Sequence, residues 1–165
     1  MELFAKRPRQ AATEVSAETK RTLYRLYLGK LLALTDYSLL AMRAAAKYSA
    51  AARLFDELSR VKLAHASQLG QLLLRYGVSP TPRLTPQREW QQLQSFCEES
   101  ERELQNTLTA HAKKERSTAK DERNAAKEPG TATALPLARI LTAMATEDEE
   151  HAAVIDGLLL RMQHS

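Results

Sequence analysis

The sequence predicts an all-α protein, a bundle of four long helices, and three observations carry this prediction. Ala, Leu, Glu, Arg, Gln and Lys are abundant, whereas Gly occurs only five times and Pro six times in 165 residues, a composition that favours helix. No stretch alternates apolar and polar residues as a half-buried strand would. Apolar residues instead recur in steps of three and four, which places them on one face of a helix.

An internal repeat divides the predicted bundle into two halves. The stretch ARLFDELSRVKLAHASQLGQLLLR (52–75) aligns without a gap with ARILTAMATEDEEHAAVIDGLLLR (138–161). In this alignment His65 corresponds to His151. Self-similarity at a fixed offset indicates a duplicated structural unit. The repeat therefore predicts two related helical hairpins.

The repeat and the composition together predict a single domain. A chain of this length corresponds to about one domain and can bury a substantial core. The predicted segments are a polar N-terminal tail (1–17) and a bundle (18–165), which comprises a first half (about 18–77), a crossover (78–87) and a second half (about 86–162).

The first half is expected to hold two helices. The first helix should run from about Ala17 to Tyr48, with Ser16 or Thr19 as its N-terminal cap. The second should run from Ser49, as a cap, to about Tyr76. Gly77 follows, and glycine commonly ends a helix because it accepts a left-handed conformation.

A proline-rich segment, residues 78–87, separates the two halves. Its three prolines favour an extended chain of roughly 3 Å per residue, long enough to cross along the side of a bundle. The third helix is expected to begin near Pro86, and the sequence leaves open whether it continues through 113–127. The stretch EPGTATAL (128–135) marks a break, and the fourth helix should run from about Pro136 to Met162.

Two polar residues interrupt the apolar face of the last helix. Asp148 and His151 are three positions apart, so their side chains point the same way, into the predicted core. Lys62 and His65 hold the corresponding positions in the first half. Burying a charge is costly unless the charge is paired or bound to a metal. These four residues therefore mark a candidate metal site or a buried ion-pair network.

With this topology and these residues, the chain resembles the ferritin-like superfamily, in its rubrerythrin and bacterioferritin branch. The resemblance covers about residues 20–162, and its most specific element is ATEDEEHAAVIDGLLL in the last helix. That family holds two iron or manganese ions in its core, with a Glu on helices one and three and a Glu-x-x-His pair on helices two and four. The resemblance implies a ferritin-like four-helix bundle of two duplicated hairpins joined by the proline-rich crossover.

The resemblance assigns metal ligands to helices two and four. In helix four the pair is Asp148 and His151, with Glu147 as an alternative carboxylate one position off the apolar face. In helix two, His65 matches the family's His, but Lys62 stands where the family has Glu. A protonated lysine has no lone pair to offer a metal. Lys62 is therefore expected to balance charge rather than to act as a ligand.

Helices one and three must supply carboxylates at the same depth as these pairs. Counting back equal lengths from the expected ends of these helices reaches Asp36 and Glu115. The repeat would instead match Asp36 with Glu122, and a helix three that ended early would favour Glu101. The order of preference is Glu115, Glu122, Glu101.

Three functions follow from these residues. The first is a ferritin-like protein with a partly degenerate carboxylate and histidine site, which binds one iron or manganese ion or none and acts mainly as a structural or interaction bundle. The second is a di-iron or di-manganese oxidoreductase, a ferroxidase or a peroxide-reducing enzyme. The third is a helical bundle that binds nucleic acid or an acidic partner through basic segments. Whether the protein is an enzyme stays open.

Composition bears on location and partners. The single cysteine, Cys97, excludes an intramolecular disulfide. No signal-peptide core is evident, and no apolar run approaches the roughly 20 residues of a membrane span. A cytoplasmic homodimer or higher homo-oligomer is the expectation. Nucleic acid is disfavoured because the basic residues of 113–127 are mixed with acidic ones, as on a solvated helix face.

Overall fold

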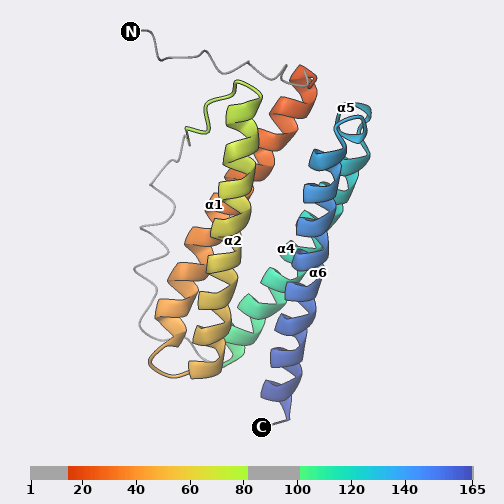
Figure 1. Cartoon of the computed structure of the whole chain (residues 1–165). Coiled ribbons are helices and arrows are strands. Elements are labelled where there is room, and N and C mark those ends of the chain that lie inside the picture. The colour runs from red at the N-terminus through yellow and green to blue at the C-terminus, as the bar shows by residue number, and fades with distance from the viewer. Residues whose placement is uncertain (1–14, 82–100, 165) are drawn as a thin grey trace, which may run out of the picture.

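The computed structural model describes residues 15–81 and 101–164, and every regular element within them is a helix (Figure 1). The predicted all-α class is therefore confirmed for the described residues. The elements are α1 (Ala17–Ala44), α2 (Ser49–Arg75), α4 (Glu101–Lys127), the short α5 (Pro129–Ala132) and α6 (Leu135–Gln163).

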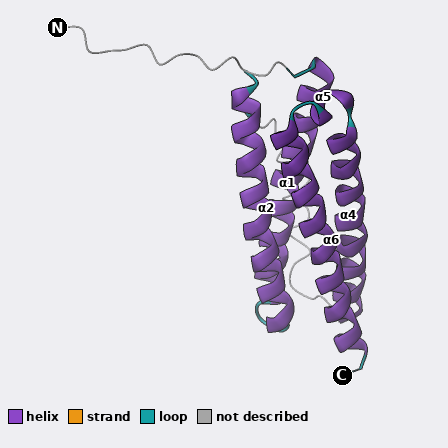
Figure 2. Cartoon of the chain, turned by 45° about the vertical axis from the view of Figure 1, so that its right-hand side comes forward, coloured by secondary structure: helices purple, strands orange, loops and turns teal. Residues whose placement is uncertain are grey.

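The four long helices lie side by side, as the two views in Figures 1 and 2 show. Helix α1 packs mainly against α2, and α4 packs mainly against α6. The short helix α5 lies at the turn between α4 and α6. The two closely packed pairs correspond to the two halves of the sequence repeat.

The described part of the proline-rich segment lies against α1. The hydroxyl of Tyr24 donates a hydrogen bond to the carbonyl of Thr81 at 2.7 Å, and that of Tyr27 donates to the carbonyl of Pro80 at 2.9 Å. Thr81 is the last described residue before the gap. The remainder of the predicted crossover and the predicted start of the third helix near Pro86 lie outside the described residues.

Two expected signals set helix ends. Ser16 precedes α1, and its hydroxyl accepts a hydrogen bond from the amide of Thr19 at 3.1 Å, which satisfies one of the free donors at the helix start. Gly77 follows α2 with φ of 73°. This left-handed conformation is open to glycine at little cost and strains other residues.

Other helix ends differ from the expectation. Helix α1 ends at Ala44, four residues before the predicted Tyr48, because the chain already turns over residues 45–47. Ser49 is the first residue of α2 and not its cap: the cap position falls on Tyr48, whose side chain makes no cap hydrogen bond. Helix α4 continues to Lys127. The predicted break contains α5, which accommodates a proline in its first turn, where no amide donor is needed.

Buried apolar side chains form two clusters, each drawing on all four long helices. One contains Tyr37, Leu40, Phe55, Leu58, Leu104, Leu108, Ile155 and Leu158. The other contains Leu23, Leu26, Leu69, Leu72, Leu73, Leu137, Leu141 and Met144. Burial of this surface at roughly 25 cal/mol per Å² holds the four helices together. The residues between the two clusters along each helix include the candidate site.

None of the helices in the described ranges combines the length and the apolar character that crossing a membrane requires.

Candidate functional site

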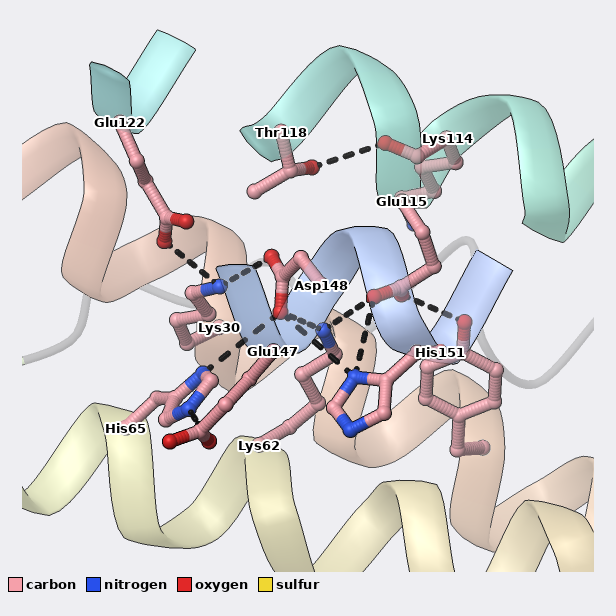
Figure 3. Close-up of polar contacts among 11 residues, drawn as sticks. Lys30, Lys62, His65, Lys114, Glu115, Thr118, Glu122, Glu147, Asp148 and His151 are labelled. Carbon is pink, nitrogen blue, oxygen red and sulfur yellow. Dashed lines mark hydrogen bonds and ion pairs between the residues drawn. The ribbon is translucent and has the colours of Figure 1, made fainter. Parts of the chain in front are cut away.

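A layer of charged side chains lies between the two apolar clusters along the helices. Figure 3 shows that each long helix contributes to this layer. Each of its five central members is 2 % exposed or less. They are Lys30 from α1, Lys62 from α2, Glu115 and Glu122 from α4, and Asp148 from α6. These five residues form the polar layer.

Lys62 lies between two carboxylates of the polar layer. Its Nζ donates a hydrogen bond to Oδ1 of Asp148 at 2.6 Å and forms an ion pair with Oε2 of Glu115. The ammonium group thus joins α2 to both α4 and α6. Charge-assisted hydrogen bonds of this kind are among the strongest in proteins.

Lys30 makes the matching contacts on the other side of Asp148. Its Nζ donates to Oδ2 of Asp148 at 2.6 Å and lies 2.7 Å from Oε1 of Glu122. The contact with Glu122 has the distance of an ion pair but not the angles of a hydrogen bond, so neither oxygen of Glu122 accepts a hydrogen bond in the described structure. Burial opposes the charge on Lys30, but Asp148 and Glu122 outweigh it and raise the pKa of the ammonium group.

The three carboxyl groups of the polar layer differ in pKa. Burial alone would raise all three. For Asp148, the nearby His151 and the two lysines outweigh burial and hold the pKa well below its usual range. Similar contacts lower the pKa of Glu115. Burial prevails at Glu122 and raises its pKa to about 7. The layer therefore contains two firmly ionised carboxylates and one carboxyl group that titrates near neutrality.

His151 borders the polar layer from α6. Its Nδ1 lies 3.5 Å from Oε2 of Glu115 and 3.7 Å from Oδ1 of Asp148. These distances are too long for strong hydrogen bonds, and Nδ1 has no hydrogen-bond partner in the described structure. Burial favours the neutral imidazole, but the two carboxylates outweigh it and raise the pKa of His151.

His65 borders the layer from α2. Its Nε2 lies 2.7 Å from Oε2 of Glu147, a residue whose side chain is half exposed. Its Nδ1 lies 3.7 Å from Oδ1 of Asp148 and lacks a hydrogen-bond partner in the described structure. Burial, with the charge of Lys30, lowers the pKa of His65. The two imidazoles of the sequence repeat thus approach the same carboxylate oxygen from different helices.

The sequence-predicted site residues divide into two groups. Glu115, Asp148 and His151 come together, with one ligand atom of each within 4.8 Å of the others, and His65 lies beside them. Asp36 does not join them: it pairs with Lys114 at 2.9 Å in a partly exposed position.

The carboxylates that the sequence offered as alternatives differ in whether they belong to the polar layer. Glu122 is buried in the polar layer, whereas Glu101 is exposed at the start of α4. Glu147, the alternative on α6, contacts His65 and not the centre of the layer. Of the three candidates on α4, the first two in order of preference both belong to the layer.

Two members of the site were missed by the sequence analysis. Lys30 is the α1 member of the polar layer, and it shares the buried face of α1 with Leu26, Ala33 and Tyr37. That spacing in steps of three and four was the signal that could have found it. Tyr37 is the second: its hydroxyl donates to Oε1 of Glu115 at 2.6 Å. Burial and this carboxylate raise the pKa of Tyr37.

The polar layer does not fit two metal ions in this arrangement. The oxygens that a metal would use, Oδ1 and Oδ2 of Asp148, each accept a hydrogen bond from a lysine. An ammonium group has no lone pair, and its charge repels a second cation at short range. The triad of Glu115, Asp148 and His151 has suitable donor atoms, but it shares two of its carboxylate oxygens with Lys62.

Comparisons of the chain with protein-family models, curated proteins and solved structures find no match.

Proposed function

We propose that the chain is a ferritin-like four-helix bundle of two duplicated hairpins joined by a crossover, and that it acts as a structural or interaction protein and not as a di-metal oxidoreductase. The observation that carries this proposal is the pair of buried lysines, Lys30 and Lys62, bound to the central carboxylates. The close packing of α1 with α2 and of α4 with α6 supports the two-hairpin arrangement.

The distribution of residues over the helices supports the ferritin-like assignment. That superfamily draws one carboxylate from each of two helices and a carboxylate and histidine pair from each of the others. Here α2 contributes Lys62 with His65, and α6 contributes Asp148 with His151, in each case three positions apart. Helices α1 and α4 contribute the remaining charged side chains. The distribution resembles that pattern, with a lysine in place of a carboxylate on α1 and on α2 and with a second buried glutamate, Glu122, on α4.

Charge neutralisation gives the polar layer a structural role. Two carboxylates about 4 Å apart repel by roughly 4 kcal/mol at an effective dielectric constant near 20. Lys30 and Lys62 convert this repulsion into attraction, because each contacts Asp148 and one glutamate of α4. A buried polar network also disfavours alternative registers, since a shifted helix would leave its charges unpaired. The layer thereby fixes how the four helices meet.

The first alternative, binding of a single iron or manganese ion, draws on Glu115, Asp148 and His151. Their oxygen and nitrogen donors suit such ions. Binding would require Lys62 to leave the oxygens that it occupies. Di-metal oxidation chemistry would require Lys30 to leave as well. Each displaced lysine would leave a buried ammonium group without its carboxylate partner, so the form in which the lysines bind these carboxylates is favoured.

The second alternative, binding to nucleic acid through α4, is weakened by the pairing of its basic residues. Lys114 pairs with Asp36, Arg116 with Asp156, and Arg123 with Glu149. Phosphate binding gains affinity from lysine and arginine charges that replace counterions. Charges already paired with carboxylates contribute less to such binding.

Exposed apolar side chains support the interaction role. Large hydrophobic residues are exposed on the outer faces of three helices: Leu32 and Met42 on α1, Leu63 and Leu74 on α2, and Val154 and Leu160 on α6. Homo-oligomer interfaces are enriched in apolar surface. We propose a cytoplasmic homodimer or higher homo-oligomer that uses such a surface, and light scattering on the purified protein would measure its mass.

The test of the proposed function is an activity measurement with the full-length protein. Fe(II) would be supplied without oxygen, and oxygen or peroxide consumption would then be followed against Fe(II) alone. We expect no acceleration over the metal in buffer, because the lysines keep the central oxygens occupied. Catalytic turnover that disappears in Asp148→Ala would establish the oxidoreductase and overturn the proposal.

A further inference from the structure

We infer that the polar layer is a two-cation site in which the ammonium groups of Lys30 and Lys62 take the places of two divalent metal ions, and that replacing either lysine by glutamate turns its place into a metal site. This inference rests on the proposed function. It goes beyond it by assigning two separate cation positions and their ligands within the layer.

The first support is the bridging geometry of Asp148. Its two oxygens each accept a hydrogen bond from a different ammonium nitrogen, both at 2.6 Å. Each nitrogen also contacts one further carboxylate, Lys62 with Glu115 and Lys30 with Glu122. One central carboxylate thus joins two cations, and each cation has a glutamate of its own. Carboxylates bridge paired metal ions in the same way.

The second support is the pair of buried imidazole nitrogens without partners. Nδ1 of His65 and Nδ1 of His151 each lie 3.7 Å from Oδ1 of Asp148, and neither takes part in a hydrogen bond in the described structure. Buried polar atoms are normally paired, so each such atom calls for an explanation. A neutral imidazole nitrogen is a metal ligand. Both atoms therefore lie beside the carboxylate oxygen that Lys62 binds, and each would offer a lone pair to a metal there when its imidazole is neutral with the proton on Nε2.

The third support is the charge balance of an exchange. Replacing a lysine by glutamate changes the charge of that side chain from plus one to minus one. The polar layer then carries two more negative charges, which one divalent ion neutralises. The same substitution supplies a new carboxylate ligand. Lys62→Glu would complete a set with Glu115, Asp148 and His151. Lys30→Glu would add its carboxylate to Glu122 and Asp148, the two residues that Lys30 contacts.

The experiment compares the wild type with Lys62→Glu, Lys30→Glu and the double variant. Each full-length protein is stripped with chelator, loaded with Mn(II), desalted and analysed for manganese and for thermal stability. We expect no ion in the wild type, one per chain in each single variant and two in the double variant. Added Mn(II) should raise the melting temperature of the variants alone. Lys114→Glu makes the same charge change at a half-exposed pair with Asp36 and should bind none.

The outcomes separate the inference from the proposed function. Folded single variants that bind no manganese would overturn the inference and leave the proposed function intact. Manganese bound by the wild type would overturn the proposed function. If Lys62→Glu folds only with Mn(II), circular dichroism will show the metal-dependent folding that the inference expects. Lys62→His is a second variant, which supplies a neutral imidazole ligand and adds no negative charge. If neither Lys62→Glu nor Lys62→His binds manganese, the inference is overturned.

Discussion

Lys62 and Asp148 hold equivalent positions in the two halves of the internal repeat, 86 residues apart, and they bind each other, with Nζ donating to Oδ1 at 2.6 Å. Equivalent positions of a duplicated unit tend to meet near its pseudo-symmetry axis. Identical acidic residues there would repel one another and need a bound cation. One basic and one acidic residue at such positions neutralise each other, as Lys62 and Asp148 do in this contact.

Replacing Lys62 by methionine should destabilise the protein strongly. The substitution keeps most of the side-chain volume but leaves Asp148 and Glu115 without their ammonium partner, and breaking a buried pair costs about 3–5 kcal/mol. Lys114→Met removes a partly exposed pair with Asp36, for which a loss of at most about 1 kcal/mol is expected. Urea unfolding at pH 7 measures both variants. Equal losses in the two would contradict the role given to Lys62.

Glu122 should make stability depend on pH between about 4.5 and 7. Its pKa is raised to about 7 in the folded protein, so over this range the folded state binds more protons than the unfolded state. Stability then falls as pH rises, by a total on the order of 3 kcal/mol at most. Glu122→Gln removes this contribution. Urea unfolding at pH 5 and pH 7.5 should show the wild type losing more stability than the variant, and parallel profiles would refute the assignment.

Asp148 should contribute to pH dependence in the opposite direction and at lower pH. Its pKa is held below its usual range, so its stabilising contribution is present above about pH 4, where the unfolded carboxyl group ionises, and is lost as pH falls further. Asp148→Asn should therefore be much less stable than the wild type at pH 7. The difference should shrink during an acid titration followed by circular dichroism. A difference that stays constant down to pH 2 would argue against an ionised Asp148.

Tyr37→Phe should cost about 1–2 kcal/mol, because it removes a buried donor to the ionised Glu115. Tyr24→Phe is the matched control, since its hydroxyl makes an exposed hydrogen bond to the backbone of Thr81 and should matter less. Absorbance titration provides a second measurement. The pKa of Tyr37 is raised, so its phenol should stay protonated until the protein unfolds in alkali. Normal ionisation of every tyrosine in the folded protein would contradict its burial beside Glu115.

Two glycines offer a paired test of the backbone. Gly77 has φ of 73°, so Gly77→Ala should destabilise the protein by about 1 kcal/mol. Gly29 lies inside α1, and a Cβ added there would meet no atom within 4 Å. Gly29→Ala should therefore stabilise the protein by up to about 1 kcal/mol. Thermal unfolding of the two variants should give shifts of opposite sign.

The helices could be read from the sequence because their apolar spacing is regular over many turns, but the depth of each site residue depends on where its helix ends. The sequence left open whether the third helix extends through 113–127; α4 does continue to Lys127, and Glu115 lies in the polar layer. Helix α1 ends four residues earlier than expected, about one helical turn. That shift accounts for four of the six positions between the expected Asp36 and the buried Lys30.

Residue type also separates the expected α1 residue from the observed one. The ferritin-like resemblance implies a carboxylate on the first helix, and Asp36 is the acidic residue near the required depth. The buried face instead carries Lys30, whose charge is tolerated only because Asp148 and Glu122 meet it from α6 and α4. The spacing of α1 marks Lys30 as a residue of the buried face, but its partner cannot be read from either helix alone, because Lys30 and Asp148 are 118 residues apart in the sequence.

The thermal stability of the wild-type protein, in chelator and in increasing Mn(II) or Fe(II) without oxygen, shows whether lysine or metal neutralises the polar layer. An ion that binds the folded state alone raises stability as its concentration exceeds the dissociation constant. If Lys30 and Lys62 are the cations of the polar layer, the melting temperature should be the same in chelator and in metal. A melting temperature that rises with metal concentration in the wild type, and no longer rises in Asp148→Asn, would contradict the account.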